Sequence, residues 1–177
     1  MQVVVMGVTG CGKTTVGRLV AQYLGAQFVD ADDFHPPANV AKMRAGIPLD
    51  DADRRPWLDA LNARLREATA RGEPLVLACS ALKAAYRERL REGIPGLRFV
   101  HLEGARELIA GRLAARSGHY MNPALLDSQF ATLERPGDAL SIDIGPPPEE
   151  LAHAVCAGLE VGRGAAGPAT PVSRSPS

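Results

Sequence analysis

Apolar residues along this chain fall into two alternating patterns. Short and mainly apolar runs, typical of buried strands, lie at residues 3–6, 27–30, 75–79, 97–102 and 139–144. Between these runs, apolar residues recur every three or four positions, which is typical of one face of a helix. Leu58, Leu61 and Leu65 form one such stripe, and Gly72 beyond them is a stop signal.

The alternation of strands and helices predicts the fold class. Strands joined by helices form βαβ units with a parallel sheet that helices cover on both faces. We therefore predict a single-domain, three-layer α/β fold over residues 1–161. Ligands of such sheets bind beyond the carboxyl ends of the strands, so motifs that follow a strand are candidate sites.

The segment after the first strand carries the most specific motif. Residues 7–14 read G-V-T-G-C-G-K-T and match the phosphate-binding pattern G-x-x-x-x-G-K-[S/T] between a strand and a helix. Glycines let backbone N–H groups surround phosphate oxygens, and the helix N-terminus adds positive potential. We expect a P-loop NTPase fold in which Lys13 reaches the β and γ phosphates and Thr14 binds Mg²⁺. The predicted ATP-binding residues are Gly7, Val8, Thr9, Gly10, Cys11, Gly12, Lys13, Thr14 and Thr15.

Acidic residues follow the second predicted strand. Asp30, Asp32 and Asp33 lie with His35 just beyond its carboxyl end. Phosphoryl transfer to an alcohol needs a group that orients the hydroxyl and takes its proton. We assign Asp32 to the acceptor hydroxyl, Asp30 to the water shell of Mg²⁺ and Asp33 to a solvated turn. For His35, contact with a substrate hydroxyl and a role in structuring the loop are both open.

Basic residues follow the third strand. Ser80 suits the N-cap of the next helix, and Lys83 and Arg87 are four positions apart, so both would project from one face of it. Two cations near a helix start in the crevice indicate an anionic acceptor. The strand has no terminal Asp, so metal binding is expected to fall to Asp30, Thr14 and water.

Further basic residues flank the long helix that carries Leu58. Lys42 lies on a short helical segment that Gly46 ends, and Pro56 is expected in the first turn of the long helix. Arg54 could bind an anionic substrate as a bidentate fork or be an ordinary surface charge.

Two arginines mark a predicted lid. Arg112 and Arg116 lie four apart, and the sequence S-G-H-Y-M-N-P at 117–123 interrupts their helix. Lids place arginines on the phosphates and exclude the water that would otherwise accept the phosphoryl group. The alternative is an ordinary helix with a polar face.

Composition narrows the class of protein. The 177 residues carry 20 acidic and 20 Lys or Arg side chains, a balance that argues against a nucleic-acid or anionic-membrane surface. No apolar run approaches the roughly 20 residues of a membrane span. Three scattered cysteines predict neither a disulfide framework nor a zinc site and fit a reducing cytoplasm; Cys11 is expected to be a small tolerated residue. Residues 162–177, rich in Gly, Ala, Pro and Ser, are expected to be disordered.

Together these segments resemble the small P-loop gluconokinases, which are related in fold to shikimate and adenylate kinases. The resemblance extends from residue 2 to residue 160 or so. It is carried by D-D-F-H-P at 32–36, G-I-P-L at 46–49, D-A-D-R-R-P-W-L at 51–58, C-S-A-L-K at 79–83, G-H-Y-M at 118–121 and S-Q-F at 128–130. The segment at 136–139 is shorter than is common in the family.

The resemblance implies a specific reaction and set of residues. The reaction is ATP-dependent phosphorylation of the 6-hydroxyl of D-gluconate, with Mg²⁺ and commonly a homodimer. Lys13, Asp32 and Arg116 would be catalytic, and Arg112 would bind the nucleotide. The substrate-binding residues would be Asp32, His35, Lys42, Arg54, Ser80, Lys83, Arg87 and Gln129.

Other functions are compatible with a phosphate-binding loop. A shikimate kinase or another small-alcohol kinase is the nearest alternative. A guanine-specific switch would carry N-K-x-D after a later strand, but the last strand here ends I-D-I-G. A nucleic-acid kinase would need a basic track that a neutral chain does not provide.

Overall fold

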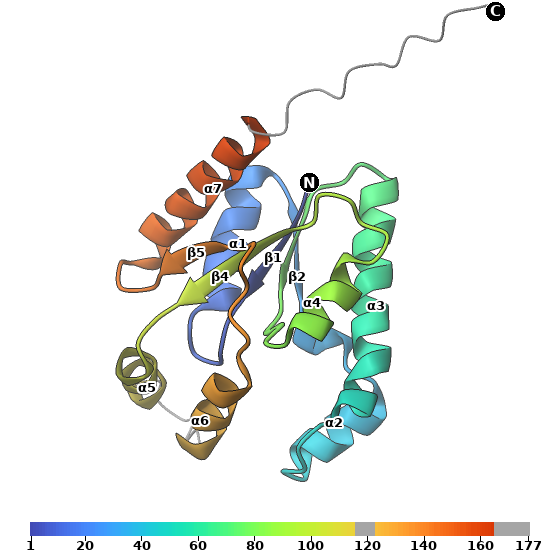
Figure 1. Ribbon diagram of the computed structural model, residues 1–177, viewed down its shortest axis with the longest axis vertical. Helices are drawn as coiled ribbons and strands as arrows, with labels where there is room; N and C mark the ends of the chain where they lie inside the picture. Colours follow the sequence, from blue (N-terminus) through green and yellow to red (C-terminus); the bar gives the residue numbers. More distant parts are fainter. Residues whose placement is uncertain (116–122, 165–177) are drawn as a thin grey trace, which may run out of the picture.

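The computed structural model describes residues 1–115 and 123–164 and has the predicted α/β architecture (Figure 1). Five parallel strands form one sheet in the order β2-β3-β1-β4-β5. The strands are β1 (Gln2–Met6), β2 (Gln27–Asp30), β3 (Leu75–Ala78), β4 (Arg98–Glu103) and β5 (Leu140–Asp143). Each strand end lies within one residue of its predicted position.

Helices cover both faces of the sheet and gather at one end of it (Figure 1). On one face lie α1 (Lys13–Leu24) and α7 (Pro148–Gly164), and on the other α3 (Asp51–Ala70) and α4 (Ala84–Arg91). At the end where the strands finish lie η1 (Ala31–Phe34), α2 (Pro37–Arg44), α5 (Arg106–Ala115) and α6 (Pro123–Thr132). Among the described residues, no helix is long and apolar enough to cross a membrane.

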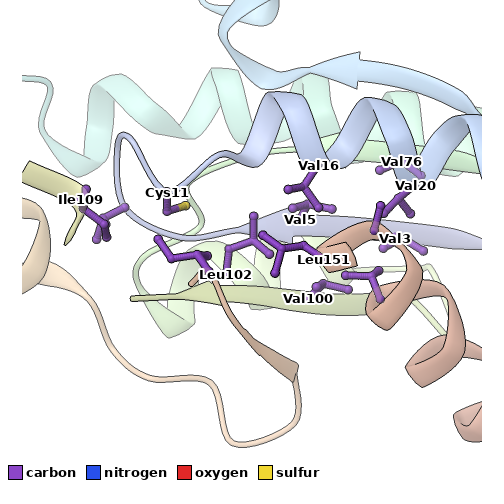
Figure 2. Close-up of a cluster of buried hydrophobic side chains, with 14 of the residues drawn as sticks. Val3, Val5, Cys11, Val16, Val20, Val76, Val100, Leu102, Ile109 and Leu151 are labelled. Atoms are coloured by element: carbon purple, nitrogen blue, oxygen red, sulfur yellow. The ribbon is translucent and has the colours of Figure 1, made fainter. Parts of the chain in front are cut away.

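Strand β1 lies at the centre of the core, and every one of its residues is buried. Val3 and Val5 point to the α1 and α7 side, where they pack with Val16, Val20 and Leu151 (Figure 2). The neighbours of these valines, Val4 and Met6, pack on the opposite face with residues of α3 and α4. A strand buried on both faces needs a continuous apolar run, which is why the pattern at 3–6 was so clear.

The start of α3 differs from the expectation in the position of Pro56. Helix α3 begins earlier than its apolar stripe, because Asp50 and Asp53 form a reciprocal capping box at its N-terminus. Pro56 therefore lies inside the helix, past the first turn, and its predicted first-turn position is wrong.

A close approach joins α1 to β2. A Cβ atom built on Gly17 of α1 would lie 2.9 Å from Cε2 of Phe28 in β2, which is closer than Cβ contacts normally come. The absence of a side chain at this position therefore sets the spacing between the helix and the strand.

The C-terminal boundary stays a prediction. Helix α7 runs to Gly164, past the expected domain end at residue 161, and residues 165–177 of the expected tail lie outside the described residues.

Candidate active site

The phosphate-binding loop has the backbone that its glycines predict. Gly7, Gly10 and Gly12 have φ angles of +143°, +78° and +97°, a region that side chains with a Cβ rarely adopt. The loop leads into α1 at Lys13. Its N–H groups thus converge at a helix N-terminus, the arrangement that binds phosphate.

Lys13, Thr14 and Asp30 meet at this loop. Lys13 Nζ donates to the Val8 carbonyl at 2.8 Å, which folds the ammonium over the loop. Thr14 Oγ1 donates to Asp30 Oδ2 at 3.0 Å, so the two predicted metal-binding side chains lie together. Two oxygen donors beside a phosphate site fit Mg²⁺, which usually keeps several of its waters. In residues 1–115 and 123–164, no cluster of three metal-binding side chains occurs.

The cysteines near the loop are structural. Cys11 and Cys79 are both buried. Burial raises the pKa of the Cys11 thiol and raises the pKa of Cys79 to about 12, so both thiols stay protonated. This agrees with the expectation that Cys11 fills space in the loop.

Gln129 and Arg112, from the C-terminal half of the chain, have different partners. Gln129 Oε1 accepts from the Thr9 N–H at 2.6 Å. The structure therefore places Gln129 on the phosphate-binding loop, away from the acceptor-side cations with which it was grouped. Arg112 donates to the Ile144 carbonyl, just after β5, at 2.6 Å, and its nucleotide contact stays a prediction.

Asp32 lies in η1, directly after β2. The Asp30 side chain accepts from the Asp32 N–H at 3.2 Å and so caps this short helix. The Asp32 side chain is 89% exposed, and its Oδ1 lies 4.0 Å from His35 Nε2. The carboxylate is therefore open to solvent at the carboxyl end of β2.

His35 is held as a neutral group. Its ring stacks on Trp57 at 4.6 Å between centroids, and Trp57 Nε1 donates to the Ala31 carbonyl at 2.7 Å. Burial lowers the pKa of His35, and the nearby Arg54 lowers it further against the opposing effect of Asp32. The imidazole is thus fixed in place and uncharged at neutral pH, which supports both roles considered for it.

Lys83 belongs to a small charged cluster on the acceptor side. Its Nζ lies 2.8 Å and 3.0 Å from the two carboxylate oxygens of Asp51, and the Tyr86 hydroxyl donates to the same carboxylate. Arg54 lies over the Tyr86 ring at 5.8 Å. Hydrogen bonds from Lys83 and Tyr86 hold the pKa of Asp51 below its usual value. The cluster therefore keeps two cations, Lys83 and Arg54, beside the Tyr86 ring.

Two predictions about the start of α4 are wrong. Helix α4 begins at Ala84 with Lys83 at its N-cap, so Ser80 is no cap and Lys83 does not share a helix face with Arg87. Arg87 is only 5% exposed, and its Nη1 donates to the carbonyls of Ala81 and Leu82 at 2.9 Å and 3.1 Å. Ser80 instead accepts from the Gly7 N–H through its carbonyl at 3.3 Å.

Lys42 also has a structural partner. Its Nζ lies 2.7 Å from Asp53 Oδ1, and this contact with the capping box of α3 raises the pKa of Lys42. Asp53 thereby joins α2 to α3. Arg116, the third expected catalytic residue, lies outside the described residues.

Three residues at this site were not assigned roles from sequence. Asp51 and Tyr86 hold Lys83, and Glu134 bonds to the N-terminus of α4. Their contacts join residues 32 to 50 positions apart, and no local spacing reveals them. Asp51 stands in a run of acidic residues and begins the motif D-A-D-R-R-P-W-L at 51–58, and these were its available signals.

Comparison with known proteins assigns the chain to a family. A family described as "AAA domain" matches residues 3–136. A gluconokinase from Gluconobacter oxydans is 53% identical over 135 residues, or 76% of each chain. A probable gluconokinase from Rattus norvegicus is 46% identical and covers 88% of this chain and 96% of its own.

The chain belongs to the gluconokinase family. Among solved structures, a gluconokinase from Sinorhizobium meliloti is 44% identical, with a TM-score of 0.82 over 90% of this chain and 91% of its own. A shikimate kinase from Aquifex aeolicus is 18% identical with a TM-score of 0.56, so it shares the fold alone. This family member is therefore an enzyme of ATP-dependent gluconate phosphorylation, and the shikimate alternative loses its support.

Proposed function

We propose that this protein transfers the γ-phosphoryl group of ATP to the 6-hydroxyl of D-gluconate and that Mg²⁺ assists the transfer. One observation carries the proposal: in a chain of the gluconokinase family, the phosphate-binding loop, the exposed Asp32 carboxylate and Lys83, which pairs with Asp51, follow β1, β2 and β3, whose carboxyl ends lie at the same edge of the sheet. Groups arranged in this way can bind ATP and an anionic alcohol at the same time.

Each group would have a separate task. The loop N–H groups would hold the phosphates, with Lys13 released from the Val8 carbonyl to span the β and γ positions. Thr14 and Asp30 would hold Mg²⁺ and its waters. When bound, Mg²⁺ would offset charge on the phosphate oxygens. Arg112, and Arg116 beyond the described residues, would complete the nucleotide side.

Asp32 would orient the acceptor hydroxyl and take its proton as the phosphoryl group leaves ATP. Lys83 and Arg54 would bind the carboxylate of gluconate, and neutral His35 would contact a hydroxyl group. Arg87, through the carbonyls it binds, and Lys42, through Asp53, would hold the surrounding backbone. Gln129 would hold the phosphate-binding loop at Thr9. A homodimer and a cytoplasmic location remain predictions.

A coupled ADP-release assay tests the proposal. Gluconate, shikimate, glucose and no acceptor are offered in parallel with ATP and Mg²⁺, and the product is identified by mass and NMR. Turnover with gluconate alone, phosphorylated at the 6-position, is expected. Turnover only with another acceptor, or ADP release without one, would refute the acceptor assignment.

A further inference from the structure

One short segment of chain reaches both sides of the site. In α6, Gln129 accepts from the Thr9 N–H of the phosphate-binding loop. Soon afterwards, Glu134 reaches the acceptor side, where its Oε2 accepts from the Ala84 N–H at 2.7 Å. The Glu134 N–H also donates to the Leu82 carbonyl at 2.9 Å. This segment therefore contacts the turn that precedes α4 through both side chain and backbone.

The carboxylate of Glu134 supplies a cap that α4 lacks. The first N–H groups of a helix have no partner within it, and an N-cap side chain usually accepts one. The N-cap of α4 is Lys83, whose side chain makes no such bond. A carboxylate is well suited to this position because a helix N-terminus is positive. Glu134 caps the helix from 50 positions away in sequence.

The turn held in this way is strained. Ala81 has a φ of +45°, the only positive value at a non-glycine residue among those described. Such a conformation persists only where its surroundings maintain it. Here Arg87 binds the carbonyls of Ala81 and Leu82, and Glu134 binds the Leu82 carbonyl and the Ala84 N–H. Lys83 lies between Leu82 and Ala84, the two residues that Glu134 binds.

We propose that Glu134 is a positioning residue for the phosphoryl acceptor. By capping α4 it fixes residues 81–83, and this fixes the Lys83 ammonium at the edge of the crevice beside Asp51. The effect should fall mainly on the acceptor, because the capped residues lead to Lys83, while the contact of this turn with the phosphate-binding loop is made one residue earlier, by the Ser80 carbonyl with the Gly7 N–H. This inference rests on the proposed function.

Steady-state kinetics on three variants tests the inference. In Glu134→Ala the KM for gluconate should rise about fivefold to tenfold, the effect of losing a typical helix cap, while the KM for ATP changes less than about twofold. Glu134→Gln keeps an acceptor oxygen and should restore the KM for gluconate to within about twofold of wild type. Glu88→Ala removes an exposed carboxylate of α4 that forms an ion pair with Arg91 and serves as the matched control.

Two results would overturn the inference. One is an unchanged KM for gluconate in Glu134→Ala, or an equal rise in both KM values. The other is a Glu134→Gln variant as impaired as Glu134→Ala, because a cap needs an oxygen and not a charge. If Glu134→Ala does not fold, Glu134→Asp gives the same test, since its shorter side chain falls short of Ala84. Wild-type protein without gluconate turnover would instead refute the proposed function.

Discussion

The two sides of the active site are built from different kinds of contact. The phosphate side consists of backbone N–H groups on a loop, underlain by apolar residues such as Val5 and Cys11 (Figure 2). The acceptor side consists of paired side chains from separate elements, as in Lys83 with Asp51 and His35 with Trp57.

This difference indicates where the substrate is selected. A loop of backbone N–H groups binds the phosphates of any nucleoside triphosphate. The geometry of the loop depends little on which side chains surround it. Paired side chains can be exchanged without disturbing the sheet, so we expect acceptor specificity to depend on them. Substitutions on the two sides should consequently separate effects on ATP from effects on gluconate.

The largest expected effect is on the phosphate side. Lys13→Ala should lower kcat roughly 100-fold or more, because the ammonium stabilises charge on the transferring phosphate. Thermal unfolding should be unchanged, since the main contact of Lys13 is a single bond to the Val8 carbonyl. Arg71→Ala, which removes a cation from the far end of α3, is the control. Wild-type kcat in Lys13→Ala would contradict the assignment.

Asp32→Asn should have a comparable effect from the acceptor side. The amide cannot take the proton of the hydroxyl, so we expect kcat to fall by about two orders of magnitude. The neighbouring Asp33→Asn removes the same charge from an exposed residue and should stay near wild type. A full pH–rate profile of both variants makes the comparison. Equal rates would remove Asp32 from the mechanism.

Asp51→Asn should have a smaller and more selective effect. Losing this carboxylate frees Lys83 and Tyr86, so the KM for gluconate should rise about fivefold, within the range of exposed ion pairs. The KM for ATP should not change. The control is Asp59→Asn. Asp59 lies on α3 like Asp51, and the substitution breaks its ion pair with Arg89 of α4. A rise in the KM for ATP alone would show that the cluster belongs to the nucleotide side.

The smallest expected effect concerns stability and pH. His101 in β4 is 2% exposed, and burial lowers its pKa below 6.5, with Arg135 and Arg87 adding to the shift. The folded state therefore binds fewer protons than the unfolded state below pH 6.5, and stability falls as pH drops through this range. Wild type should lose more stability than His101→Gln between pH 7.5 and pH 5.5 in denaturant titrations. Equal losses of stability in the two proteins would show that His101 does not contribute to the pH dependence of stability.

The sequence predicted the phosphate side better than the acceptor side for a physical reason. A loop whose shape depends on glycines at fixed spacing is a local feature, and so is a buried strand such as β1. The partners of Lys83, Lys42 and Gln129 lie far along the chain and depend on how helices pack. The prediction of Ser80 as an N-cap is wrong because the strained turn at Ala81 comes between Ser80 and the start of α4. The helix and turn propensities of the residues do not indicate this turn.

The missing side chain at Gly17 has a consequence for catalysis. A methyl group there would push the ring of Phe28 outward, and Phe28 lies in the strand that ends at Asp30. Thr14 stands one turn earlier on the same helix as Gly17. The small size of Gly17 thus helps to set the 3.0 Å distance between Thr14 Oγ1 and Asp30 Oδ2, the two oxygens that would hold the metal ion.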